Sequence, residues 1–293
     1  MVEMKKKIII TGAAGFTGNS ACQYFADKGY DVIGISRSDL AEVKVRVVTC
    51  DLLDKEKVSE IFDFYKPDFC LHLAGVNSVP RSWNDPSSTI EANVLGTVYL
   101  LEAIRKAVPS CRTVIVSSAL SGIDHPYGVS KKHQEQLVAD WANLFDLQLM
   151  IAKPCNLIGP GRSPGFVSFL ANRIIQLESS GDHSPINISH LQNEREFLDV
   201  RDAIAAYEVL LKAGNRNVTY EIGSGKMTTL LEILDIFQTL TKEKLTIIET
   251  NDTKDLSPRV MNSELIKDYN WQTVYPLELS IKQILSYHRS VGS

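Results

Sequence analysis

A tyrosine and a lysine stand four residues apart in the run Tyr127-Gly-Val-Ser-Lys131. Residues at this spacing lie one above the other on a helix, so a helix here would bring the phenol close to the ammonium group. A tyrosine in water has a pKa of about 10, and a neighbouring positive charge favours phenolate and lowers that pKa. The pair is therefore a candidate acid and base for chemistry at a carbonyl or alcohol group.

Two serines precede this pair. The run Val114-Ile-Val-Ser117-Ser118 reads as a buried strand that places a hydroxyl group at its carboxyl end. That hydroxyl would share the substrate oxygen with Tyr127, and the pattern leaves Ser117 and Ser118 both open as candidates. Because Tyr-x-x-x-Lys also arises by chance on amphipathic helices, the interpretation depends on the elements around it.

The N-terminal segment predicts a dinucleotide site. An apolar run, Ile8-Ile-Ile10, is typical of a buried parallel strand, and a helix is predicted over residues 19–28. Between them, closely spaced glycines allow a tight turn and close approach of a diphosphate to the helix N-terminus. The residues predicted to bind the dinucleotide here are Gly12, Gly15, Phe16, Thr17 and Gly18.

The ends of the next strands predict the rest of the cofactor site. The second strand, over residues 31–35, ends in Ser36-Arg37, and a hydroxyl with an arginine suits a 2′-phosphate whereas a carboxylate would suit a 2′-hydroxyl. The sequence thus favours NADP(H) over NAD. The third and fourth strands end in residues predicted to meet the adenine and to let the cofactor lie across the sheet: Asp51, Leu52, Leu73, Ala74 and Gly75.

Strand and helix alternate through this half of the chain, which predicts an α/β fold with a doubly wound parallel sheet of the Rossmann type. The polar segment over residues 75–86 is predicted to be irregular, and its position after the carboxyl end of a strand favours a wall of the active site over a simple surface loop. Beyond residue 214 the pattern predicts a strand and turn over 217–225, helices over 230–240 and 277–287, and a strand over 245–250.

Length and charge exclude several classes of protein. The chain has 293 residues, enough for one large or two smaller units, and a net charge of −4, so nucleic acid is not an expected partner. No apolar run approaches the length of about 20 residues that spans a bilayer, and residues 1–7 lack the apolar stretch of a signal peptide, so we expect a cytoplasmic protein without a membrane partner. The cysteines and histidines show no metal-binding spacing, so no metal is expected.

Several motifs occur in a characteristic order and resemble the extended short-chain dehydrogenase/reductase family, the NAD(P)-dependent sugar-nucleotide epimerases, dehydratases and reductases, over nearly the whole chain. These motifs are Thr11-Gly-x-x-Gly-Phe-x-Gly18, Asp51-Leu52, His72-Leu-Ala-Gly75, Asn93-Val-x-Gly-Thr97, Ser117-Ser118, Tyr127-x-x-x-Lys131, Lys153-Pro154-Cys-Asn156-Leu-Ile-Gly159-Pro-Gly161 and Arg195-Glu-Phe-Leu-Asp199-Val-Arg-Asp202. We expect a Rossmann domain over residues 1–154 and 198–224, and a smaller, discontinuous α/β lobe over 155–197 and 225–293 that binds the sugar nucleotide.

Within that family the sequence looks most like the GDP-4-keto-6-deoxy-D-mannose reductases, which use NADPH to reduce C4 of a 4-keto-6-deoxy sugar nucleotide. The resemblance implies that Tyr127 donates the proton, that Lys131 binds the nicotinamide ribose and lowers the tyrosine pKa, and that Ser118 meets the C4 oxygen. It also implies a cofactor contact from Pro154, and substrate contacts from Ser78, Arg81, Ser117, Asn156, Val167, Arg195 and Arg259. A homodimer formed through the helices that begin near Asn93 and Tyr127 is implied as well.

Two departures from the family pattern bear on the substrate. The dehydratases carry an acidic pair directly after the catalytic hydroxyl, where this chain has Ala119 and Leu120, so loss of water across C5 and C6 is not expected. The loop between Ser118 and Tyr127, which walls the sugar site, is shorter than in most members. A 4-epimerase would use the same catalytic residues, although Ser36-Arg37 speaks against it, and the intact Ser/Tyr/Lys set speaks against a non-catalytic NADP-sensing protein.

Overall fold

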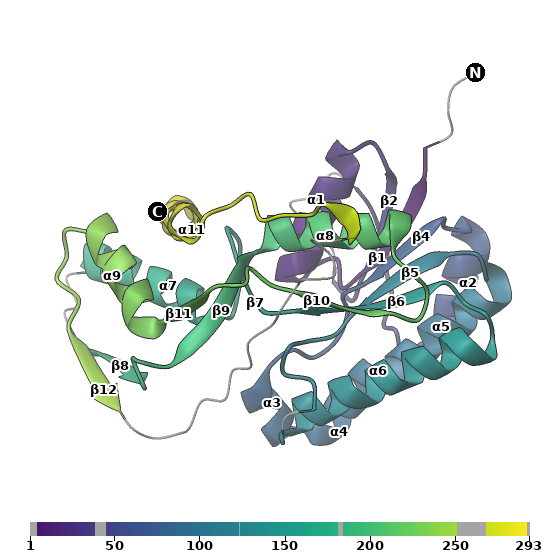
Figure 1. The fold of residues 1–293 in the computed structure, drawn as a ribbon, viewed down its shortest axis with the longest axis horizontal. Helices are drawn as coiled ribbons and strands as arrows, with labels where there is room; N and C mark the ends of the chain where they lie inside the picture. The colour runs from purple at the N-terminus through teal and green to yellow at the C-terminus, as the bar shows by residue number, and fades with distance from the viewer. Residues whose placement is uncertain (1–4, 39–44, 123, 181–183, 251–267, 292–293) are drawn as a thin grey trace.

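Seven parallel strands form the large sheet, in the order β10-β6-β5-β4-β1-β2-β3 (Figure 1). Their bounds are β1 Lys7–Thr11, β2 Asp31–Ser36, β3 Arg46–Thr49, β4 Phe69–His72, β5 Arg112–Val116, β6 Leu149–Pro154 and β10 Thr219–Ile222. The computed structural model describes residues 5–38, 45–122, 124–180, 184–250 and 268–291. Chain order reverses between β1 and β4, and in such sheets the crevice at the carboxyl ends next to this point binds the ligand. The predicted doubly wound α/β fold is confirmed.

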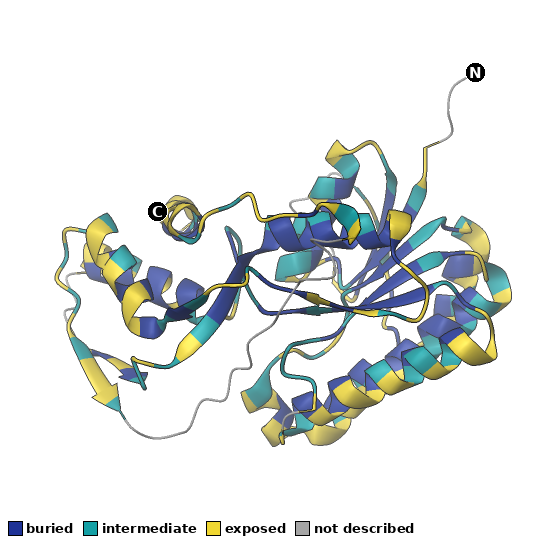
Figure 2. Cartoon of the chain, in the orientation of Figure 1, coloured by how far each residue is buried: buried dark blue, intermediate teal, exposed yellow. Residues whose placement is uncertain are grey.

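Helices cover both faces of this sheet (Figure 1). One face carries α1 Phe16–Asp27 and α8 Val200–Ala213, and the other carries α2 Lys55–Tyr65, α5 Gly96–Ala107 and α6 Pro126–Leu144. Successive residues of β1 serve the two sides in turn, because strand side chains alternate: Ile8 and Ile10 join one core cluster and Ile9 the other. Figure 2 shows these strands and the inward helix faces buried, with exposed residues on the outer helix faces.

The smaller lobe has a core of its own, made by residues between Ile158 and Leu285. Its elements are β7 Asn156–Ile158, α7 Phe166–Ser180, β8 Ile186–Ser189, β9 Glu194–Asp199, β11 Met227–Thr229, α9 Leu230–Leu240, β12 Ile247–Thr250 and α11 Leu277–Val291. The strands pair as β11-β9-β7 and β12-β8. The proposed division into two domains stays a prediction. Trp271, in the C-terminal segment assigned to the smaller lobe, packs into the core cluster of the large sheet.

The polar segment after β4 differs from the prediction, because most of residues 79–86 are helical rather than irregular. They belong to α3 Val79–Asn84 and α4 Pro86–Ile90. Each helix begins with a proline in its first turn and a side-chain cap: Ser78 Oγ accepts from Arg81 N at 3.3 Å and Asp85 Oδ1 from Ser88 N at 3.1 Å. Capping residues followed by proline are helix-start signals, and they outweighed the polarity of the segment.

Two further findings concern membranes and cysteines. None of the helices in the described residues is long and apolar enough to cross a bilayer. All five cysteines are buried thiols without a disulfide partner, as expected of small core residues.

Candidate active site

The glycine-rich turn after β1 leaves no room for side chains where it meets β4. Gly12 has a φ of +70°, and a Cβ atom there would lie 2.8 Å from the backbone nitrogen of Ala74. A Cβ atom at Gly18 would overlap the carbonyl group of Gly12. Gly15 caps helix α1 without a side-chain hydrogen bond, so backbone N–H groups of the first turn remain available to an anion. These residues fit the diphosphate of a dinucleotide.

The carboxyl ends of β2 and β3 carry the residues predicted to select the cofactor. Ser36 is 7% exposed and its Oγ accepts from Ser38 N at 3.2 Å, whereas Arg37 is exposed. Asp51 is also exposed, and its Oδ1 accepts from the backbone of Leu53 at 3.0 Å. A guanidinium group, rather than a carboxylate, therefore follows β2 at the edge of the sheet where a dinucleotide ribose would lie.

The turn after β4 is held by side chains from two neighbouring elements. The backbone N–H groups of Leu73 and Ala74 both donate to Thr11 Oγ1 at 3.2 Å. Asn93, on the π-helical turn η1 Glu91–Leu95, accepts from Val76 N at 2.7 Å and donates back to the Val76 carbonyl at 3.0 Å. A Cβ atom on Gly75 would collide with Asn93, which explains why the turn ends in glycine.

A buried chain of hydrogen bonds connects this turn to helix α6. The Thr97 hydroxyl donates to the Asn93 carbonyl at 2.8 Å and accepts from Gln134 Nε2 at 2.8 Å. It also lies 3.0 Å from His72 Nε2. Because the Thr97 proton is committed to Asn93, Nε2 of His72 must be the donor, and Nδ1 then accepts from Thr11 Oγ1 at 2.8 Å. The network thus defines a single tautomer of His72.

Lys131 lies at the end of this chain and is 5% exposed. Its Nζ donates to the Val116 carbonyl at 3.0 Å and to Gln134 Oε1 at 2.9 Å. Both partners are neutral, and burial lowers the pKa of Lys131 to about 8, with the charge of Glu135 acting in the opposite direction. Burial, together with the Lys131 charge, lowers the pKa of His72 to about 3, so the imidazole stays neutral.

Tyr127, one turn before Lys131, is 5% exposed. Burial raises its pKa, hydrogen bonding with Ser118 acts in the opposite direction, and the Glu135 charge raises it further. The lowering expected from Lys131 is not seen, because burial dominates and the ammonium group binds two neutral oxygens instead. A protonated phenol is consequently the resting form at neutral pH, which suits a proton donor.

The two serines after β5 make different contacts. Ser117 is 5% exposed, and its hydroxyl donates to Glu135 Oε1 at 2.5 Å. Ser118 is half-buried, accepts from Leu120 N at 3.1 Å, and is the serine that interacts with the Tyr127 phenol. The structure therefore brings Ser118, Tyr127 and Lys131 together, and directs the Ser117 hydroxyl to a carboxylate.

Two residues that the sequence analysis did not assign fix the start of α6. His125 caps the helix by accepting from Gly128 N at 2.8 Å, and its ring stacks on that of Tyr127 at 5.9 Å between centroids. Ser82 on α3 accepts from the backbone N–H of Tyr127 at 3.1 Å. Pro126 at the first position of the helix was a visible helix-start signal, but histidine is not among the usual capping residues, and nothing local pointed to Ser82.

The comparisons with known proteins agree with this geometry. Residues 8–223 match the NAD dependent epimerase/dehydratase family. The chain belongs to this family. It is 26% identical to the GDP-6-deoxy-D-mannose reductase of Pseudomonas aeruginosa over 97% of each chain. Among solved structures it is 25% identical to RMD from Pseudomonas aeruginosa complexed with NADPH, with a TM-score of 0.86 over 98% of this chain and 100% of that one.

A UDP-glucose 4-epimerase from Thermotoga maritima, solved with UDP-glucose, has a TM-score of 0.87 with 98% of this chain and 100% of that chain covered. At 21% identity this likeness shows the fold alone. This chain therefore shares its scaffold with a reductase and with an epimerase, and the choice between such reactions has to come from the residues of the site.

The predicted substrate residues in the smaller lobe differ in how far their side chains are exposed and in what they contact. Asn156 Nδ2 donates to the Glu196 carbonyl at 3.0 Å, next to Pro154 at the end of β6. Arg195 is half-buried on β9, and burial lowers its pKa. Val167 is 1% exposed inside the core of the lobe, so only its backbone is available to a nucleotide base.

Of the other predicted substrate residues, two lie at helix α3 of the large domain and one lies outside the described residues. Ser78 caps α3, as described above, and Arg81 on that helix is exposed. Arg259 lies outside the described residues.

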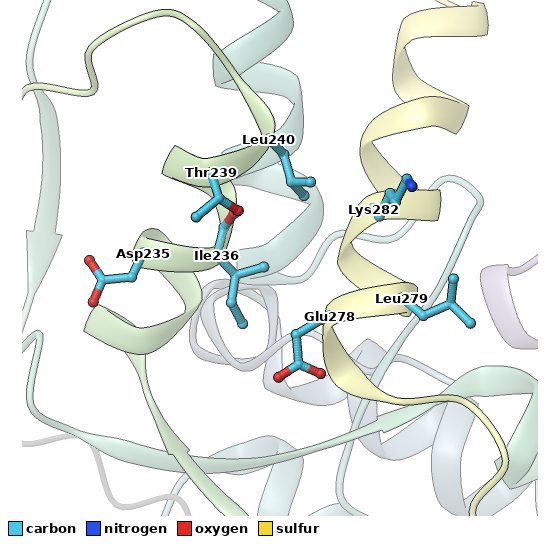
Figure 3. A pocket seen from close by; sticks show the side chains of 7 residues that line it. All are labelled: Asp235, Ile236, Thr239, Leu240, Glu278, Leu279 and Lys282. Carbon is cyan, nitrogen blue, oxygen red and sulfur yellow. The ribbon is translucent and has the colours of Figure 1, made fainter.

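A cavity of about 480 Å³ lies between α9 and α11 of the smaller lobe (Figure 3). Apolar atoms form most of its wall, and none of its lining residues belongs to the predicted site; these are Asp235, Ile236, Thr239, Leu240, Glu278, Leu279 and Lys282. It is thus separate from the site around Tyr127.

Proposed function

We propose that this family member is an NADPH-dependent reductase of the C4 ketone in a nucleotide-linked 4-keto-6-deoxyhexose. The observation that carries the proposal is the grouping of Ser118, Tyr127 and Lys131 beside the turn after β4, with the phenol held in its protonated form. A protonated donor of this kind is what reduction of a ketone to an alcohol requires.

The roles of the three side chains follow from their surroundings. When bound on the turn after β1, NADPH supplies the hydride. Ser118 donates a hydrogen bond to the ketone oxygen, and Tyr127 transfers its proton to that oxygen as negative charge develops there. Lys131, an ammonium group at neutral pH, binds the ribose hydroxyls and favours the phenolate that remains.

Residues after Ser118 speak against dehydration. Ala119 donates its backbone N–H to the Pro154 carbonyl at 3.0 Å, and neither Ala119 nor Leu120 has a side chain that can carry a proton. Removal of water from the sugar needs an acid and a base at this place. Reduction of the ketone needs no acid or base other than Tyr127.

The relatives support the proposed cofactor and substrate class. The relative in Pseudomonas aeruginosa is a GDP-6-deoxy-D-mannose reductase that matches along 97% of this chain, and RMD was solved with NADPH. The exposed Arg37 after β2 is suited to a 2′-phosphate. Homodimeric assembly and cytoplasmic location stay predictions.

The proposal is tested by offering the purified protein GDP-, UDP- and dTDP-linked 4-keto-6-deoxy sugars with NADPH or NADH, while following nicotinamide absorbance. We expect oxidation of NADPH in preference to NADH, with one nucleotide favoured. Interconversion of nucleotide hexoses without net change in cofactor would instead identify an epimerase, and would refute the reductase.

The two serines provide a matched pair of variants. Ser118→Ala is expected to lower kcat about 10- to 100-fold, because a hydrogen bond to the developing charge is lost, with little change in the KM for NADPH. Ser117→Ala should retain most of kcat, since the Ser117 hydroxyl faces Glu135. Steady-state kinetics on both variants decide the matter, and a larger loss of kcat in Ser117→Ala would reverse the assignment.

A further inference from the structure

Three ionisable side chains follow one another at four-residue spacing on helix α6: Tyr127, Lys131 and Glu135. This spacing places them along one face of the helix. The first two belong to the proposed reaction, whereas the mechanism above has no use for the third. Glu135 is nevertheless only partly accessible, with 19% of its side chain exposed.

Glu135 is held from two strands. Ser117, directly after β5, donates its hydroxyl to Oε1. Lys153, near the end of β6, places Nζ 3.4 Å from Oε1 and 3.5 Å from Oε2. Because β5 and β6 are neighbours in the sheet, the carboxylate is fixed at the carboxyl edge, one turn from Lys131.

Lys131 is a buried cation whose two direct partners, Val116 and Gln134, are uncharged. A buried charge without a counter-charge is unstable and tends to lose its proton. His72 on β4 is a neutral ring and Tyr127, one turn earlier on the helix, is a protonated phenol, so neither supplies a negative charge, and Lys153 pairs with Glu135. Glu135 is the anion that acts on Lys131 within the described residues.

We propose that Glu135 is a positioning residue: its carboxylate, held between Ser117 and Lys153, supplies the negative charge that keeps the buried Lys131 an ammonium ion at the pH at which the enzyme works. Lys153 tempers this effect by neutralising part of the carboxylate. The inference rests on the proposed function for its catalytic consequence, but the charge of Lys131 can be measured without any substrate.

The test uses protein labelled with [ε-13C]lysine, in which the Lys131 signal is assigned by its absence from Lys131→Arg. Its titration midpoint is measured at low ionic strength in the parent protein and in Glu135→Gln, Lys153→Met and Asp140→Asn. Asp140 is the matched control, because it is an exposed carboxylate on the same helix whose partner is Gln136.

We expect Glu135→Gln to move the Lys131 midpoint to lower pH by about 0.5 to 1 pH unit, and Lys153→Met to move it to higher pH. Asp140→Asn should leave it unchanged. The alkaline limb of kcat/KM with a keto sugar and NADPH should move in the same directions. A merely structural role for Glu135 would lower activity without displacing this limb.

The proposal is overturned if Glu135→Gln leaves the midpoint where it was, or if Lys153→Met moves it in the same direction as Glu135→Gln. Should Glu135→Gln fail to fold, the direction seen in Lys153→Met decides alone. If none of the keto sugars tested causes the parent protein to oxidise NADPH, the proposed function fails. The Lys131 titration midpoints would still support or refute the role of Glu135.

Discussion

Tyr127→Phe is expected to lower kcat for NADPH-dependent ketone reduction by about 10²- to 10⁴-fold, the range over which general acid catalysis contributes. The variant removes one oxygen from a side chain that is 5% exposed and leaves the ring in place, so the fold and its stacking on His125 should persist. Single-turnover measurement of nicotinamide absorbance with the preferred keto sugar provides the rate.

A matched control for this variant is Tyr287→Phe, which removes a tyrosine hydroxyl from α11 in the smaller lobe. It should keep the parent rate. Both variants should bind NADPH as the parent does, which fluorescence titration checks. Retention of more than a tenth of the rate in Tyr127→Phe would show that another group delivers the proton, and His125, stacked beside the tyrosine, would be the next candidate.

Lys131→Met is expected to weaken NADPH binding about 10- to 100-fold, because charge-assisted hydrogen bonds to the ribose are lost, and to lower kcat as well. The loss in stability should stay small. Removing the buried charge relieves a desolvation penalty, which offsets the loss of hydrogen bonds to Val116 and Gln134. Fluorescence titration with NADPH, steady-state kinetics and thermal unfolding measure the three quantities.

Lys132→Met is the control, since Lys132 is the exposed neighbour on the same helix.

The parent enzyme should also lose kcat/KM as the pH rises through about 8, because the pKa of Lys131 is lowered to about 8 and the protonated form is the active one. Full activity therefore lies below that pH. In Lys131→Met the fall of kcat/KM through about pH 8 should be absent. Equal NADPH affinity in Lys131→Met and the parent would refute the assigned contact between Lys131 and the ribose.

Much of the fold was predictable because its signals are local. The apolar run before Thr11, the glycines after it and the alternation of strands with helices predicted the nucleotide-binding half, and the helix over residues 230–240 was found at the predicted bounds. The error over residues 79–86 arose from weighing polarity above helix-capping signals that were present in the sequence.

The sequence alone was sufficient to identify the motifs that define the family. It also predicted that Tyr127 and Lys131 share one helix face, because this follows directly from a four-residue interval. It could not determine the charge states. Burial raises the pKa of Tyr127 and lowers that of Lys131, and burial depends on how α6 packs on the sheet.

The tertiary structure also distinguishes the two serines by their contacts. Ser117, Glu135 and Lys153 lie on separate elements, 18 residues apart in each step, and no local pattern links them. Only the parallel pairing of β5 with β6, beneath α6, brings the hydroxyl, the carboxylate and the ammonium group together. That packing occupies Ser117 and leaves Ser118 beside the Tyr127 phenol.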